Sequence, residues 1–140
     1  MRVMAIDYGD ARIGLAVSDL TGTLAGEAWT MQEYDAARAA ARIAEEAKRR
    51  DVTVLVLGLP RNMDGSEGPR AEKTRALAAL LQEASGLTPV LWDERRSSVE
   101  AHAILHAGGK RMKRHRETVD AVAAALILEG YLGALPRRAP

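Results

Sequence analysis

Residues 2–19, "RVMAIDYGDARIGLAVSD", decide the fold of this chain. The apolar run that starts at Val3 ends on Asp7, and the turn-rich residues 8–11 then lead into a second apolar run. Two apolar runs joined by a short turn that contains glycine are typical of an antiparallel β-hairpin. The pattern predicts strands at Arg2–Asp7 and Arg12–Ser18, and it leaves a carboxylate at the carboxyl end of the first strand.

The rest of the chain continues as a meander and then as alternating elements. The patterns predict strands at Gly26–Met31, 52–60 and 88–95, and helices at 35–50 (with Asp35 as N-cap), 69–84, 97–109 and 118–133. Residues 110–117, "KRMKRHRE", are predicted as a basic loop. This order favours an α/β fold: a five-stranded mixed sheet, its first three strands an antiparallel meander, flanked by helices on both faces.

Length and composition exclude several classes of protein. The 140 residues predict a single domain over 1–135, with 136–140 as a flexible tail. The absence of cysteine excludes disulfides, thiolate zinc sites and a cysteine nucleophile. No apolar run approaches the roughly 20 residues that span a bilayer, so we expect a cytoplasmic protein. The net charge of +1 says little about partners, and the distribution of charge matters more.

Acidic residues fall at the ends of predicted elements. Asp7 ends the first strand, Asp93 and Glu94 end the fifth, and Asp120 lies near the start of an apolar helix. Ligands of open α/β sheets bind at the carboxyl ends of strands, so Asp7 is expected to meet the acids that end the fifth strand. Because strand side chains alternate, only one of Asp93 and Glu94 can point towards it. Clustered carboxylates favour a hard cation, Mg²⁺ or Mn²⁺. The alternatives are a turn role for Asp7 and a solvent-facing Asp120.

Basic and polar residues near these acids are candidates for phosphate contact. They lie beside the first turn, in the loop after residue 60, and in the segment before Asp120: Arg12, Arg61, Asn62, Lys110, Arg111, Lys113, Arg114 and Arg116. The alternative is that these side chains are ordinary solvated surface. His102 and His106 are spaced as a zinc-chelating pair, but no acidic motif accompanies them.

Four segments together resemble one family. "AIDYGDARIGLAVSD", "VLGLPRNMDGSEGPR", "WDERRSSVEAHAIL" and "TVDAVAAALILEGYL" have the order and spacing of the YqgF/RuvX family of ribonuclease-H-like proteins. That family is described as Holliday-junction resolvases and as nucleases that process the 5′ end of precursor 16S rRNA. The resemblance implies a ribonuclease-H-like fold and a site of Asp7, Glu94 and Asp120. It also implies two metal ions, with Gly9 and Gly14 letting a phosphodiester approach the hairpin.

Two features depart from the pattern that the resemblance implies. Arg96 follows the "DER" motif where many relatives carry a hydrophobic residue. Better-understood resolvases of this fold use four acids, whereas three align here. Glu117 shares a helix face with Asp120, and we expect it to be solvated.

The leading hypothesis is a metal-dependent endonuclease acting on structured RNA such as pre-16S rRNA, or on branched DNA. Paired cuts in a junction would require a homodimer. One alternative is a catalytically idle nucleic-acid binder in ribosome assembly. The other is an actin-like ATP-binding domain, because "DYGDARIGLA" resembles the phosphate loop of that class.

Overall fold

The computed structural model describes residues 1–94 and 112–136, with no side chains described for 112–119. Its elements are β1 (Arg2–Tyr8), β2 (Arg12–Ser18), β3 (Ala25–Gln32), α1 (Ala36–Arg49), β4 (Val52–Leu59), α2 (Pro69–Ser85), β5 (Val90–Asp93) and α4 (Met112–Ala134). The predicted helix at 97–109 and the tail from residue 137 onward lie outside the described residues.

The sheet has the order β3-β2-β1-β4-β5. β1 pairs antiparallel with β2, and β2 pairs antiparallel with β3. β4 lies parallel to both β1 and β5. The predicted mixed sheet with an antiparallel meander is therefore confirmed.

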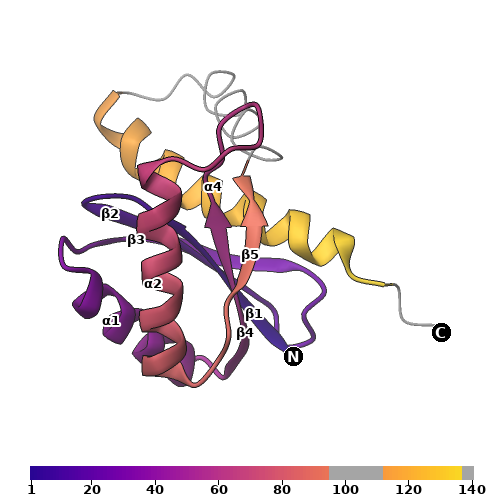
Figure 1. The fold of residues 1–140 in the computed structure, drawn as a ribbon. Helices are drawn as coiled ribbons and strands as arrows, with labels where there is room; N and C mark the ends of the chain where they lie inside the picture. Colours follow the sequence, from indigo (N-terminus) through magenta and orange to yellow (C-terminus); the bar gives the residue numbers. More distant parts are fainter. Residues whose placement is uncertain (95–111, 137–140) are drawn as a thin grey trace.

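Helices cover both faces of this sheet (Figure 1). On one face α1 and α2 pack over large side chains such as Ile6, Leu15 and Leu57, all fully buried. On the other face α4 packs on small residues of the strands, including Ala5 and Ala16. Because strand side chains alternate between faces, the odd-numbered residues of β1 face α4. None of the described helices is long and apolar enough to cross a membrane.

Local capping explains where two helices begin. The side chain of Asp35 accepts a hydrogen bond from the Arg38 backbone N–H at 2.9 Å, which confirms it as the N-cap of α1. Pro69 occupies the first turn of α2, where its missing N–H costs nothing.

The predicted basic loop at 110–117 is wrong from Met112 onward. The structure begins α4 at Met112, so the residues after it form helical turns. The reason is that Met, Lys, Arg and Glu all have high helix propensity, and neither Gly nor Pro interrupts this stretch. A high density of charged residues indicates a solvent-exposed segment, but such a segment can be helical as well as a loop.

Candidate active site

Asp7 lies at the end of β1 on the face that α4 covers. The fully buried Val3 and Ala5 precede it on this face, and Asp7 itself is only partly buried. Its cross-strand partner in β2 is Gly14. A Cβ atom on Gly14 would collide with the backbone carbonyl of Asp120. The absence of a side chain at Gly14 therefore lets the α4 backbone rest on the strand and brings Asp120 to Asp7.

This contact corrects the expected role of Gly14. The resemblance implied that Gly14 leaves room for a phosphodiester, whereas the space above it is filled by the backbone of α4. Gly9 belongs to the turn: its N–H donates to the Arg12 carbonyl at 3.0 Å, and an added Cβ would lie 2.6 Å from that oxygen.

Glu94 reaches Asp7 from β5. Gly58 of β4 pairs with Trp92, and a Cβ on Gly58 would lie 2.6 Å from Glu94 Oε1, so the Glu94 side chain lies over that glycine. Burial, a hydrogen bond with Asp7 and the charge of Asp7 together raise the pKa of Glu94 to about 9. These effects favour the protonated form of Glu94, which a hydrogen bond links to Asp7. By alternation from Trp92, Asp93 points to the other face, as expected.

Asp120 is the third carboxyl group of the site. Burial raises its pKa, the charge of Asp7 raises it further, and Arg12 and Arg70 oppose the shift. Arg12 Nε lies 3.1 Å from Asp120 Oδ2. That buried oxygen nevertheless accepts no hydrogen bond from the described residues, because the short distance is not matched by a suitable angle. A buried carboxylate oxygen without a hydrogen bond is an available ligand for a cation.

The three carboxyl groups form two pairs that share Asp7. Asp7 acts on Glu94 through a hydrogen bond and charge, and on Asp120 through charge. Within residues 1–94 and 120–136 no three acidic, histidine or cysteine side chains converge closely enough to hold a metal ion as they stand. The donor chemistry fits a hard cation, since all ligands are carboxylate oxygens, but side-chain movement is needed to assemble the set.

The predicted nucleic-acid contacts divide into three groups. Arg12 pairs with Asp120. Arg61 lies 3.8 Å from Glu67, and the Asn62 amide donates to Ser66 Oγ at 3.0 Å, so both help to order the loop between β4 and α2. Lys110 and Arg111 lie outside the described residues, and the side chains of Lys113, Arg114 and Arg116, at the start of α4, do too. The same holds for Arg96, His102, His106 and the side chain of Glu117.

Sequence reasoning missed Arg70. It lies in the first turn of α2, and its positive charge partly offsets the raised pKa of both Glu94 and Asp120. A signal was present in the sequence, because Pro69 marks the start of a helix that follows the carboxyl end of a buried strand. Ligand sites of α/β sheets lie at that edge.

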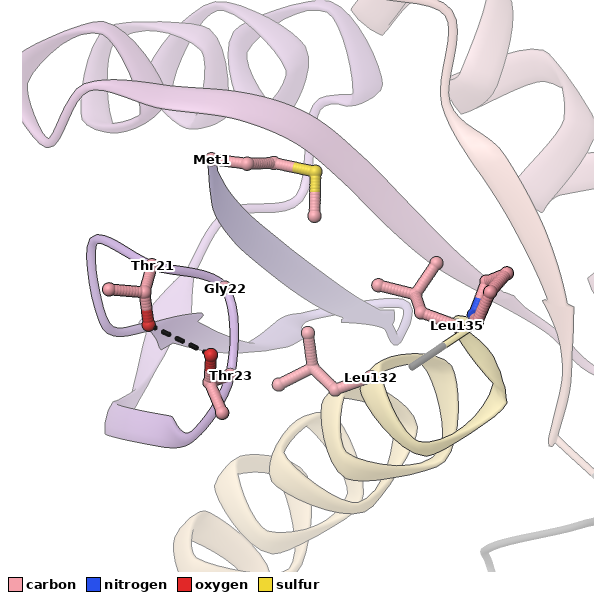
Figure 2. A pocket seen from close by; sticks show the side chains of 7 residues that line it. Met1, Thr21, Gly22, Thr23, Leu132 and Leu135 are labelled. Atoms are coloured by element: carbon pink, nitrogen blue, oxygen red, sulfur yellow. Dashed lines mark hydrogen bonds between the residues drawn. The ribbon is translucent and has the colours of Figure 1, made fainter. Parts of the chain in front are cut away.

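A cavity of about 430 Å³ lies at the other end of β1, beyond Met1 (Figure 2). It is lined by Met1, Thr21, Gly22, Thr23, Leu132, Leu135 and Pro136. The Thr21 hydroxyl donates to Asp19 Oδ2 at 2.7 Å, and it shares a hydrogen bond with the Thr23 hydroxyl, with 2.9 Å between the two oxygens (Figure 2). Among the described residues that line the cavity there is no carboxylate, lysine or arginine side chain.

Sequence comparisons find relatives that match nearly the whole chain. A protein of Myxococcus xanthus (strain DK1622) named "Putative pre-16S rRNA nuclease" is 46% identical over 134 residues, covering 96% of this chain and 89% of that protein. A protein of the same name from Anaeromyxobacter dehalogenans (strain 2CP-1 / ATCC BAA-258) is 46% identical over 140 residues, covering 100% of both.

Solved structures of resolvases have a similar fold. The structure described as "T. thermophilus RuvC in complex with Holliday junction substrate" superposes with a TM-score of 0.61 at 17% identity, over 96% of this chain and 97% of that one. The Fowlpox virus resolvase, solved with Holliday junction DNA, gives 0.61 at 12% identity over 98% and 100%. At such identities the likeness concerns the fold alone, and it confirms the predicted ribonuclease-H-like class.

The family itself is shown by a model that covers nearly the whole chain. The model described as "RuvX: Holliday junction resolvase" matches residues 1–134. The relatives above are named as nucleases, in agreement with the class of activity that the sequence predicted. The chain therefore belongs to the RuvX family.

Proposed function

We propose that this chain is a nuclease that hydrolyses phosphodiester bonds in structured RNA, in the 5′-end processing of pre-16S rRNA. Relatives with that name share 46% identity over the whole length of the chain, whereas the resolvases of known structure share less than half as much. Asp7, Glu94 and Asp120 are its proposed catalytic and metal-binding residues.

The observation that supports this proposal most is the arrangement of the carboxyl groups around Asp7. Glu94 is held against Asp7 by burial and a hydrogen bond, and Asp120 Oδ2 is buried without a hydrogen bond from the described residues. Such an arrangement is unfavourable for a purely structural role, because each charged form destabilises its neighbour. It becomes favourable when divalent cations compensate the charge.

Mg²⁺ or Mn²⁺ ions, two in the leading hypothesis, would supply an activated water and stabilise the attacking and leaving oxygens. The chain has two tasks of its own before that. Glu94 must release its proton, so metal binding is coupled to proton release and strengthens as pH rises. Arg12 must turn away from Asp120 Oδ2, which frees its guanidinium for a substrate phosphate.

A second candidate substrate is a four-way DNA junction, because the family model carries the description Holliday junction resolvase. Symmetric resolution needs two cuts related by a two-fold axis, and therefore a homodimer. RNA trimming has no such requirement. Measuring whether the chain is a monomer or a dimer on each substrate therefore distinguishes the two candidate substrates without relying on cleavage rates.

Asp7→Asn tests the activity, and Asp10→Asn is its matched control. Asp10 is an exposed residue of the next turn that pairs with Lys73 at 3.2 Å, so the same change of charge is made outside the site. Both variants are assayed on a labelled pre-16S 5′-leader RNA and a four-way DNA junction, with Mg²⁺, Mn²⁺ or chelator. Circular dichroism monitors the fold.

We expect metal-dependent RNA cleavage by wild type and Asp10→Asn, and at least a hundredfold loss in a folded Asp7→Asn. Cleavage by Asp7→Asn at the wild-type rate would refute the proposed site. Cutting of the junction alone would replace RNA by DNA as the substrate. Retained binding without cleavage by wild type would favour the assembly-factor alternative.

A further inference from the structure

Arg70 lies in the first turn of α2, at the edge of the sheet where the acids meet. β4 ends at Leu59, and the following loop returns at this edge to begin α2 at Pro69 (Figure 1). The same end of β4 carries Gly58, over which the Glu94 side chain lies. The topology therefore places Arg70 at the same edge of the sheet as the acidic site.

Most other described basic side chains at this edge are already paired. Arg12 lies 3.1 Å from Asp120, Arg61 3.8 Å from Glu67, Lys73 3.2 Å from Asp10 and Arg75 2.6 Å from Glu67. These pairs neutralise the charge of the cations and hold them in place.

Arg70 differs from these residues. It is exposed, and its guanidinium forms neither an ion pair within 4.0 Å nor a hydrogen bond with any residue in the described part of the chain. Its charge still acts on Glu94 and on Asp120, which belong to different elements. A cation that influences two acids without contacting either leaves its hydrogen-bond donors available to a third group.

The chemistry of that third group follows from its surroundings. A guanidinium presents donors in a planar fork that matches two oxygens of a phosphate. The α2 N-terminus adds to the positive potential, because Gly68 provides no side-chain cap for its free N–H groups. The carboxylates repel an approaching polyanion, so an available cation beside them favours the approach of a phosphodiester strand.

We propose that Arg70 binds a backbone phosphate of the nucleic-acid substrate next to the Asp7, Glu94 and Asp120 site, and so positions the strand for cleavage. This inference rests on the proposed nuclease function and adds a residue to it. Arg70 is a binding and positioning residue here, and it takes no part in proton transfer.

The test measures binding of a labelled pre-16S 5′-leader RNA in the cleavage-deficient Asp7→Asn background, over a series of salt concentrations. Arg70→Ala is compared with Arg49→Ala. Arg49 is an exposed residue of the last turn of α1 that pairs with Glu46, so this control makes the same change of charge away from the acids. Arg70→Lys keeps the charge and removes the fork.

We expect Arg70→Ala to weaken binding roughly tenfold, in line with the loss of a hydrogen-bonded charge contact. The slope of log K against log salt should fall by about 0.7 to 0.9, the value for one phosphate. Arg70→Lys should retain the slope with weaker affinity, and Arg49→Ala should match the parent. Because the Arg70 side chain is exposed, all three variants are expected to fold.

An Arg70→Ala affinity and slope equal to those of Arg49→Ala would overturn the proposal. That outcome differs from a failure of the proposed function, which is judged by cleavage in wild type and Asp7→Asn with Arg70 intact. If wild type cuts normally and Arg70→Ala binds RNA normally, the proposed nuclease function stands and the proposed role of Arg70 is refuted.

Discussion

Gly14→Ala tests whether one missing side chain sets the position of α4. The new methyl group would collide with the Asp120 backbone carbonyl, and neither backbone can move without its whole element. The expected response is that α4 lifts from the sheet near Asp120. Both the stability of the chain and the geometry of the acids then change together.

The magnitude follows from what α4 buries. Ile127 and Leu128 are at most 1% exposed, and burying two such side chains contributes about 3 to 6 kcal/mol. A gap of about 0.5 to 1 Å forfeits roughly a quarter to a half of such contacts. The expected loss is thus about 1 to 3 kcal/mol, which agrees with the usual cost of overpacking.

Urea unfolding followed by tryptophan fluorescence is the assay. Trp92 packs edge-on against Tyr131 of α4 with ring centroids 6.2 Å apart, so its emission reports helix docking. The midpoint should fall by roughly 1 M, given a slope of about 1 to 3 kcal/mol per M. In the control Gly133→Ala the added Cβ meets nothing within 4 Å, so stability should hold or rise by up to about 1 kcal/mol. A Gly14→Ala midpoint equal to that of wild type would refute the reasoning.

Three further predictions concern the site and the sheet. Gly58→Ala places a Cβ 2.6 Å from both Glu94 Oε1 and Ile127 Cδ1. Those are side-chain ends that can move, so cleavage should fall about 100-fold with a smaller loss of stability than in Gly14→Ala; unchanged cleavage would contradict the role of Glu94. The pKa of Glu94 is raised to about 9 from 4.5, so its stabilising contribution is full below pH 4.5 and is lost as pH rises towards 9. With chelator, the urea midpoint should therefore fall between about pH 5.5 and 8.5, and Glu94→Gln should flatten that trend; identical profiles would exclude Glu94 as the cause. Ser18 is fully buried and its Oγ accepts from the Val3 N–H at 2.8 Å. Ser18→Ala should cost about 1 to 3 kcal/mol in urea unfolding, against less than about 0.5 for the exposed Ser66→Ala; equal effects would count against this bond.

Local sequence patterns predicted most of the fold. The hairpin of β1 and β2, the third strand, the N-cap at Asp35 and the Pro69 start of α2 all match the structure within a residue or two. Each depends on neighbours along the chain, such as alternation, capping and turn residues, so a linear reading is sufficient. The loop predicted at 110–117 is wrong from Met112 onward because charge was treated as a guide to backbone conformation.

The candidate site could be predicted only in part. Asp7, Glu94 and Asp120 were identified by their positions at the ends of elements and by family resemblance. The sequence could not predict the pairwise arrangement of these acids around Asp7 or the ion pair of Arg12 with Asp120. Both depend on contacts between elements that are distant in the sequence. The contribution of Arg70 also arises between elements, since α2 brings its charge to Glu94, just after β5, and to Asp120 in α4.

The sequence by itself therefore determined the kinds of elements, their order and the candidate acids, since these depend on local periodicity and residue chemistry. The tertiary structure decided which side chains meet. Asp120 comes within range of the Asp7 charge because Gly14 lets α4 rest on β2, and Glu94 bonds to Asp7 with its side chain over Gly58. Arg70 is left unpaired among the described residues while Arg12 is not. The physical reason is that such contacts depend on strand register and helix docking, which are properties of the packed chain and are absent from any short stretch of it.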